Sequence, residues 1–434
     1  MKIQIFSTSP KTFFQEMVPL LTMERPNVSI DFSKKHQFHI GFGGALTDSA
    51  AYVYAQLPRA LKQEVLDALY GQNGLNYSLG RIPIASCDFS LESYDFISSV
   101  DQSDFSLQPI KQYLLPLVHS VLNYKKITLM ASSWSPPAIY KSNHLRTHGG
   151  KLLRKYYQAY AEYLTRFLSD LIKENIRVTM LTIQNEPLAT QVWESCIFTG
   201  PEELRLAKIL RNCLDKAQLK HISLFGWDHN RDKMVTRARV LFKEDEIFAG
   251  IAYHWYDQGI HQAIAKVKQN YPNKVVLFTE GCVELLHYQH PKNAVGLYSH
   301  ALRYARNYLK DILAGSQGFI DWNILLDSSG GPNHVGNFCE APLMYDTDKQ
   351  ILIYNPSYFA LKHFAHFIQV NAQRISVSTS SPNLELCAYQ NPDNSIVLVV
   401  INNGNQEKIV IDFANQNMMC YIESDSITSI YITQ

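Results

Sequence analysis

The chain has 434 residues, of which 46% are hydrophobic and 18% are charged, a composition typical of a globular protein with a large core. Its 40 basic and 39 acidic residues leave a net charge of +1. This balance gives no electrostatic reason to expect nucleic acid or an anionic membrane as the main partner. The 7 cysteines are widely spaced without a CxxC pair, so neither a zinc site nor a disulfide framework is indicated.

The first 36 residues show neither a helical pattern nor a signal sequence. Lys11 and Glu16 fall where a signal peptide would need a continuous apolar run. No apolar run in the sequence has the length of a membrane span. We therefore expect a cytoplasmic protein without a transmembrane segment, in which residues 1–36 pair with a β-rich segment elsewhere in the chain.

Between residues 37 and 368, short apolar runs alternate with amphipathic stretches. The clearest helical patterns cover 152–172 and 293–314, and a last helix is expected near 355–368. Near-continuous apolar strands between helices indicate a parallel sheet covered by helices. The eight candidate strands are 38–44, 76–84, 127–134, 178–186, 222–228, 247–256, 274–280 and 318–326.

Eight such units favour a (β/α)8 barrel over an open doubly wound sheet. No dinucleotide-binding or phosphate-binding glycine motif follows the first strand, which further disfavours the open sheet. After residue 369 the pattern changes to short alternating strands joined by turn sequences such as NPDN and NNGN. The sequence therefore predicts an α/β fold with a (β/α)8 TIM barrel at 37–368. A small all-β side domain, built from both chain ends, would comprise 1–36 and 369–434.

Polar and aromatic residues gather at the C-terminal ends of the predicted strands, where the active sites of such barrels lie. Carboxylates accept hydrogen bonds from sugar hydroxyls, and an indole ring stacks on the apolar face of a sugar. The set therefore predicts a site for a neutral polyhydroxylated ring. Its members are Asp48, Arg81, Asp88, Trp134, Asn185, Glu186, Asp228, His254, Trp255, Tyr256, Glu280, Trp322 and Asn323.

Two of these residues, Glu186 and Glu280, suit cleavage of a glycosidic bond, which requires one neutral carboxylic acid and one carboxylate. Pro187 disfavours helical geometry at the residue before it, so we expect Glu186 to be extended. Tyr256 ends the strand next to that of Glu280, where its hydroxyl could donate a hydrogen bond that keeps Glu280 ionised. The negative charge of Glu280 should in turn raise the pKa of Glu186.

Seven motifs follow the strand order along nearly the whole chain. They read GFGGALTD (41–48), RIPIASCDFS (81–90), ASSWSPP (131–137), IQNEP (183–187), AYHWY (252–256), FTEGC (278–282) and DWNILLDSSGGPNHVGNF (321–338). In this order they resemble glycoside hydrolase family 30, in its glucosylceramidase and acid β-glucosidase group.

The resemblance implies a retaining mechanism with Glu186 as acid/base and Glu280 as nucleophile, their carboxyl groups about 5 to 5.5 Å apart. Asn185 would bind the sugar 2-hydroxyl and Tyr256 would orient the nucleophile. Neither a metal nor another cofactor is implied. Positions that match the glucose subsite are Asp88, Trp134, Trp322 and Asn337, and positions that match its surroundings are Arg81, Asp228 and His254.

The expected function is hydrolysis of one terminal β-glucosyl unit, from a small β-glucoside or from glucosylceramide. A β-xylosidase, an endo-β-1,6-glucanase and a transglucosylase remain open as alternatives, because they would use the same residues. A non-catalytic sugar-binding barrel is disfavoured, since both glutamates are present with Asn185 and Tyr256. His334 stands where the lysosomal members carry a tryptophan, and the natural aglycone stays open.

Several site candidates also have a simpler structural interpretation. Asp88 could cap a turn, and Trp134 and Trp322 could be packing residues. His254 could be a hydrogen-bonded structural residue or a proton shuttle. Cys282, which follows Glu280 closely, has the character of a small buried hydrophobic residue.

Overall fold

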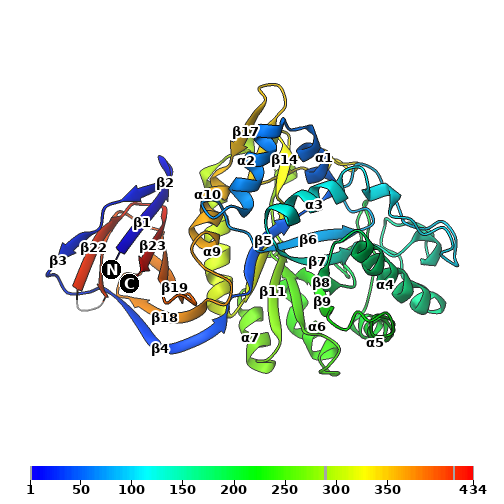
Figure 1. The fold of residues 1–434 in the computed structure, drawn as a ribbon. Coiled ribbons are helices and arrows are strands. Elements are labelled where there is room, and N and C mark those ends of the chain that lie inside the picture. The colour runs from blue at the N-terminus through cyan, green and yellow to red at the C-terminus, as the bar shows by residue number, and fades with distance from the viewer. Residues whose placement is uncertain (1, 288–290, 414–415, 434) are drawn as a thin grey trace.

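The computed structural model describes residues 2–287, 291–413 and 416–433. Eight parallel strands close into a barrel, which confirms the predicted (β/α)8 fold (Figure 1). Each strand pairs with the next one along the chain, and β13 closes the ring against β5. The barrel strands are β5 (Gly41–Ala45), β6 (Leu79–Ile84), β7 (Thr128–Ser133), β8 (Val178–Thr182), β9 (Ser223–Asn230), β10 (Gly250–His254), β11 (Val275–Glu280) and β13 (Gly318–Asn323).

Helices cover the outside of this barrel. The helix predicted at 152–172 is present as α4 but begins five residues later, after a short 3-10 turn. The helix predicted at 293–314 begins only at Tyr298, because Gly296 interrupts the helical backbone with φ 77°. The helices are α1 (Asp48–Gln56), α2 (Arg59–Tyr70), α3 (Leu114–Tyr124), α4 (Tyr157–Lys173), α5 (Gly200–Lys216), α6 (Met234–Leu241), α7 (Gln262–Asn270), α8 (Pro291–Ala294), α9 (Tyr298–Ala314) and α10 (Pro356–Ala365).

The barrel strands are largely apolar on both faces, and both faces are buried. Outward-facing side chains such as Ile82, Leu181 and Ile251 join the large core beneath the helices. Inward-facing side chains fill the barrel and make it a packed core. This inner cluster consists of Leu79, Met130, Met180, Phe225, Ala252, Leu277 and Ile320.

Both chain ends form the side domain, as predicted, and the two termini lie close together in it (Figure 1). β1 pairs with β23, and β4 pairs with β18. β4 continues past the expected domain boundary at residue 37 and ends at Phe38. The strands are β1 (Lys2–Ser9), β2 (Thr12–Met17), β3 (Leu20–Thr22), β4 (Val28–Phe38), β18 (Gln373–Thr379), β19 (Leu384–Gln390), β20 (Ile396–Asn402), β21 (Glu407–Phe413), β22 (Gln416–Ile422) and β23 (Ser426–Thr433).

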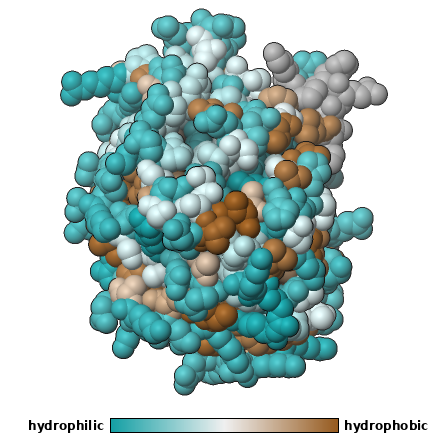
Figure 2. Space-filling view, turned by 90° about the vertical axis from the view of Figure 1, so that its right-hand side faces the viewer, coloured by the Kyte–Doolittle hydropathy of each residue, from teal (hydrophilic) through white to brown (hydrophobic). Residues whose placement is uncertain are grey.

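Polar contacts join the side domain to α9 and α10. The His363 ring on α10 is hydrogen-bonded to the hydroxyls of Thr8 and Ser429. The Tyr298 hydroxyl at the start of α9 donates to the carbonyls of Thr8 and Asp425. These contacts hold the side domain against the barrel, on the side opposite to the face shown in Figure 2. That face is largely hydrophilic, and its apolar side chains lie in small groups.

Five further short strands form two small sheets. β12 (Val283–Glu284) pairs with β15 (Cys339–Glu340), and a second sheet contains β14 (Leu325–Asp327), β16 (Leu343–Asp346) and β17 (Ile351–Tyr354). Among the described residues, no helix combines the length and apolar character needed to cross a membrane.

Candidate active site

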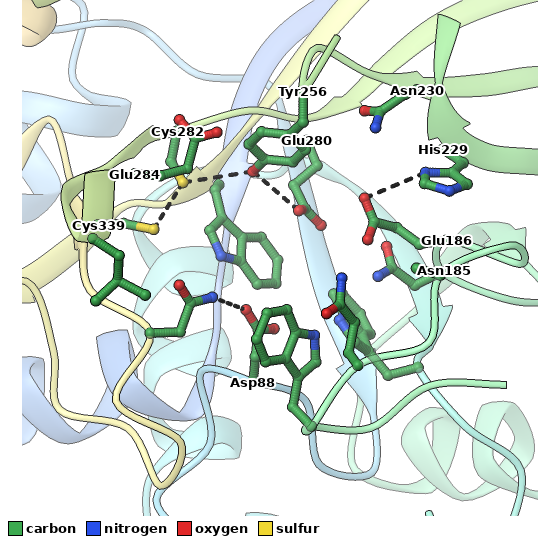
Figure 3. A pocket seen from close by; sticks show the side chains of 17 residues that line it. Asp88, Asn185, Glu186, His229, Asn230, Tyr256, Glu280, Cys282, Glu284 and Cys339 are labelled. Carbon is green, nitrogen blue, oxygen red and sulfur yellow. Dashed lines mark hydrogen bonds and ion pairs between the residues drawn. The ribbon is translucent and has the colours of Figure 1, made fainter. Parts of the chain in front are cut away.

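A pocket of about 360 Å³ lies where the barrel strands end (Figure 3). In the close-up, Glu186 and Glu280 point into the same space, and Asp88 approaches it from the opposite side. The structure brings together eight residues that the sequence assigns to the site. They are Asp88, Trp134, Asn185, Glu186, Tyr256, Glu280, Trp322 and Asn337.

The other candidates divide into two groups. Arg81, Asp228 and His254 are fully buried and contact the pocket residues without lining the pocket.

Three further strand-end residues lie away from the pocket. The Asp48 carboxylate accepts hydrogen bonds from Ser90 and Tyr94, the Trp255 ring packs on Tyr304, and Asn323 accepts a hydrogen bond from Thr47.

Glu186 is not extended as expected. Strand β8 ends at Thr182, and Glu186 has φ 46°, in the left-handed region. Pro187 disfavours the right-handed helical region at Glu186, but neighbouring strands then decide between the remaining conformations. The Glu186 N–H donates to the Asp228 carbonyl at 2.9 Å and the Asn185 N–H to the Ser133 carbonyl at 2.6 Å. These bonds hold a turn that directs both side chains into the pocket.

Strand β9 contains a β-bulge directly before the site. Its pairing with β10 shifts register between Trp227 and His229, and Trp227 and Asp228 have φ 77° and 52°. A bulge of this kind changes the direction of a side chain within a strand. Asp228 consequently faces the barrel centre, where its carboxylate accepts hydrogen bonds from Thr182 and Thr279 at 2.6 Å.

Arg81 lies below the pocket floor and bonds both Glu280 and Asp228. Its side chain is 0% exposed and pairs with Glu280 at 2.6 Å and with Asp228 at 2.9 Å. It also donates to the Asn185 side-chain oxygen at 2.8 Å. The guanidinium lies 4.7 Å from the Trp134 ring centroid, so an aromatic face covers it from the pocket side. Arg81 therefore supplies a permanent, water-shielded positive charge to Glu280.

The Tyr256 hydroxyl donates to Glu280 Oε1 at 3.1 Å, the contact that the strand order suggests. Burial raises the pKa of Glu280, and the charge of Glu186 acts in the same direction. His254 and Arg81 oppose this effect without cancelling it. The ionised form of Glu280 nevertheless keeps three partners, since Arg81 and Tyr256 bond it and His254 Nδ1 lies 3.9 Å from it.

The expectation that Glu280 raises the pKa of Glu186 is wrong. Burial does raise the pKa of Glu186, but the close contact with His229 and the hydrogen bond with His254 outweigh it, and the pKa lies below its ordinary value. The His254 ring spans Glu186 at 3.1 Å from Nδ1 and Asp228 at 3.1 Å from Nε2. Despite burial, the charges of Glu280 and its two bonded carboxylates raise the pKa of His254 to about 9. These opposite pKa shifts favour the proton on His254 over Glu186.

Asp88 faces the pocket with one oxygen unpaired. Asn337 donates to its Oδ2 at 2.9 Å, while the buried Oδ1 has no partner. Burial, and next the charge of Glu280, raise the pKa of Asp88 to about 8. The simpler interpretation of Asp88 as a turn cap therefore does not describe its contacts. A neutral Asp88 can donate to one ligand oxygen as well as accept from another group.

Trp134 and Trp322 both pack and line the pocket. Their rings stack with centroids 5.3 Å apart and an interplanar angle of 25°. Each is 2% exposed, so the two interpretations of these residues, as packing groups and as pocket walls, are both correct. Flat apolar surface beside hydroxyl-binding carboxylates suits a sugar ring.

Sequence reasoning missed several pocket residues. His229 Nδ1 lies 3.4 Å from Glu186 Oε1, and Asn230 lines the pocket beside it, because β9 continues two residues beyond the expected end at Asp228. The polar sequence of residues 228–230 was an available signal. Cys339 lines the wall from the short strand β15, whose sequence carries no strand pattern, and Cys282 lines it as well. Among the described residues, no cluster of three or more His, Cys, Asp or Glu side chains could hold a metal ion.

Comparison with known proteins agrees with this geometry. The family model of the glycosyl hydrolase family 30 TIM-barrel domain matches residues 40–368, and that of the family 30 beta sandwich domain matches residues 371–430. Lysosomal acid glucosylceramidase of Mus musculus is 31% identical over 397 residues, which cover 86% of this chain and 76% of that protein.

Two further similarities extend the comparison. The crystal structure of SrfJ from Salmonella typhimurium has a TM-score of 0.94 at 31% identity, and the match covers 100% of both chains. An endo-1,6-beta-D-glucanase of Neurospora crassa is 24% identical over 397 residues, which cover 86% of this chain and 80% of that protein. With both family domains matched in order and two carboxylates in the barrel pocket, this chain belongs to glycoside hydrolase family 30 and is a glycoside hydrolase.

Proposed function

We propose that this enzyme is a retaining, exo-acting β-glucosidase of the glucosylceramidase type. The observation that carries the proposal is the pairing of Glu186 and Glu280 across one small pocket that also presents the unpaired Asp88 oxygen. Glu280 is the nucleophile and Glu186 the acid/base. The glucosyl unit is first transferred to Glu280 with release of the leaving group, and water then hydrolyses that ester.

The positions of the two carboxylates relative to His254 favour a retaining mechanism. His254 Nδ1 lies 3.1 Å from Glu186 Oε1 and 3.9 Å from Glu280 Oε1, so these two oxygens are at most about 7 Å apart. Retaining enzymes have carboxyl separations of about 5 to 5.5 Å, and inverting enzymes about 6.5 to 9.5 Å. The upper limit of about 7 Å leaves room for the retaining separation and excludes all but the shortest inverting separations.

Glu280 is supported as the nucleophile by its partners. Arg81 stays charged at every working pH and lies 2.6 Å from it, and the Tyr256 hydroxyl fixes its other oxygen. Glu186 has no arginine or lysine partner among the described residues. Its charge is balanced only by histidine, whose proton it can accept. Glu280 is therefore the carboxylate that stays ionised, and Glu186 is the one that gains and loses a proton.

Glu186 and His254 act as a pair that shares one proton. In the free enzyme the proton lies on His254 Nδ1 and bridges to Glu186 Oε1. When a bound sugar excludes water from the pocket, the pair of protonated His254 and ionised Glu186 is disfavoured, because both charges lose their solvation. The proton then moves to Glu186, which donates it to the leaving oxygen. After the glycosyl ester forms, Glu186 takes a proton from the attacking water.

The subsite favours glucose and exo-action. A pocket of about 360 Å³ is near the lower end of ligand-site sizes, which suits one terminal sugar better than a bound polymer. Asp88 lies across the pocket from the two glutamates, and the Asn337 amide donates to its Oδ2. There they can bind hydroxyls on the far side of the ring, including the 6-hydroxymethyl group that xylose lacks.

The test compares aryl β-D-glucoside with the matched β-D-xyloside. The xyloside leaves a buried polar group unpaired, at about 1 to 3 kcal/mol, so we expect kcat/KM to favour the glucoside by about tenfold or more. The Asp88→Ala variant should narrow that ratio. A faster xyloside reaction would identify a β-xylosidase, and internal cutting of β-1,6-glucan would identify an endo-glucanase like the Neurospora relative. Glucosyl transfer to an added alcohol in preference to water would identify a transglucosylase.

A further inference from the structure

Two thiols lie in contact in the pocket wall. Cys282 Sγ is 2.9 Å from Cys339 Sγ, closer than two non-bonded sulfur atoms ordinarily approach, and both residues line the pocket (Figure 3). They come from different segments, since Cys282 directly precedes β12 and Cys339 begins β15. Glu284 pairs with Cys339 in this ladder, so the two cysteines are diagonal neighbours on one face of the small sheet.

We propose that Cys282 and Cys339 are a reversible dithiol–disulfide modification site, oxidised by small peroxides that enter through the pocket. A disulfide needs a sulfur–sulfur distance of about 2.05 Å, so the bond requires a movement of less than about 1 Å. A pocket that admits a sugar also admits hydrogen peroxide.

The chemistry balances with hydrogen peroxide as the oxidant. The thiolate of one cysteine attacks the peroxide, forms a sulfenic acid and releases one water after proton transfer. The second thiol then attacks the sulfenic sulfur, and a second water leaves as the disulfide forms. The two thiols lose two electrons and two protons in total, and the peroxide is reduced to two waters.

The contacts assign different roles to the two thiols. Cys282 donates to Cys339, so Cys339 is the sulfur that more readily becomes a thiolate and attacks first. Burial raises the pKa of Cys339 and raises that of Cys282 further above its ordinary range. Oxidation should therefore be slow at neutral pH and faster in alkaline solution, because only the thiolate reacts.

The site is coupled to both halves of the sugar pocket. Cys282 follows Glu280 by two residues, and the Tyr256 hydroxyl contacts both Cys282 Sγ at 3.5 Å and Glu280 Oε1 at 3.1 Å. Cys339 follows Asn337 by two residues, and Asn337 bonds Asp88. Closing the bond displaces groups beside the nucleophile and beside Asn337, so the disulfide form should cleave glucosides more slowly. This effect on rate rests on the proposed function.

The experiment treats the folded full chain with hydrogen peroxide at about pH 9, then unfolds it in denaturant, blocks the remaining thiols with iodoacetamide, and measures mass and peptide linkage. We expect the alkylated cysteines to fall from 7 to 5, with a Cys282–Cys339 linked peptide that dithiothreitol removes. Cys339→Val should abolish the link. Cys213→Ala removes a thiol on α5, outside the pocket, and should leave the link intact.

Activity on an aryl β-glucoside, measured before and after treatment in each variant, should fall and recover only where the link forms. The proposal is wrong if both thiols stay alkylatable at peroxide concentrations that leave the chain folded. It is also wrong if either thiol oxidises singly without the link, or if the link joins other cysteines. The mass readout is independent of catalysis, so failure of this site and failure of the proposed function are distinguishable.

Discussion

Replacing Arg81 by glutamine should shift the acid limb of the activity profile towards alkaline pH. The substitution removes the guanidinium that lies 2.6 Å from Glu280 and 2.9 Å from Asp228, while the amide retains part of the side chain's polarity. Without this cation the Glu280 anion is disfavoured and its pKa rises. A larger fraction of the enzyme then carries a protonated, unreactive nucleophile at a given pH.

The magnitude follows from the geometry of the pair. Charge centres about 4 Å apart interact by about 4 kcal/mol at an effective dielectric of about 20, and about 1.4 kcal/mol corresponds to one pKa unit. The limit is therefore a shift of about 3 units. Water that enters the vacated space screens the remaining charges, so we expect an observed shift of about 1 to 3 units in the acid limb of kcat/KM.

Arg231 offers a matched control. Its side chain is 1% exposed and also holds two buried carboxylates, Asp311 at 2.8 Å and Asp257 at 3.0 Å, outside the catalytic pocket. Breaking either buried cluster should cost about 3 to 5 kcal/mol of stability, so both Arg→Gln variants should unfold at lower temperature. Only Arg81→Gln should move the pH profile. An unshifted acid limb in a folded Arg81→Gln enzyme, or an equal shift in Arg231→Gln, would refute the assignment of Arg81 to Glu280.

Three further outcomes test the site. Azide should rescue Glu186→Ala as the β-glycosyl azide and Glu280→Ala only as the α-azide, and the reverse stereochemistry would exchange the two roles. The alkaline limb of the activity profile is set in the native enzyme by the proton that Glu186 and His254 share, near pH 9. In His254→Phe this limb should move to lower pH, because Glu186 then binds the proton alone. An unmoved limb would show that His254 does not hold the proton. Folded Asp88 keeps a proton up to about pH 8, whereas in the unfolded chain its pKa returns to the ordinary value of 3.8, so its contribution to stability falls as pH rises through this window. Asp88→Asn should remove that part of the pH dependence, as measured by denaturant unfolding, and an unchanged slope would place the pKa of Asp88 near its ordinary value.

Local sequence determined the architecture of this protein. Apolar strands buried on both faces produce continuous hydrophobic runs, and period-2 strands beyond residue 370 produce alternation, so both units can be predicted without contacts. The site residues were predictable for a related reason. The C-terminal ends of parallel barrel strands meet at one rim, so residues distant in sequence, such as Asp88 and Glu280, are placed together by topology alone.

Only the tertiary structure decided the directions and charges within the site. The left-handed turn at Glu186 depends on a hydrogen bond to the Asp228 carbonyl of the next strand, and the bulge at Asp228 is a feature of pairing with β10. The proton assignment depends on His254 lying between the carboxylates of Glu186 and Asp228, which come from different segments. Cys339 reaches the wall from the two-residue strand β15, which is too short to show a periodic pattern. Electrostatic and hydrogen-bonding energies depend on which groups are neighbours in space. These features therefore follow from distances between segments, and the order of residues along one segment does not specify those distances.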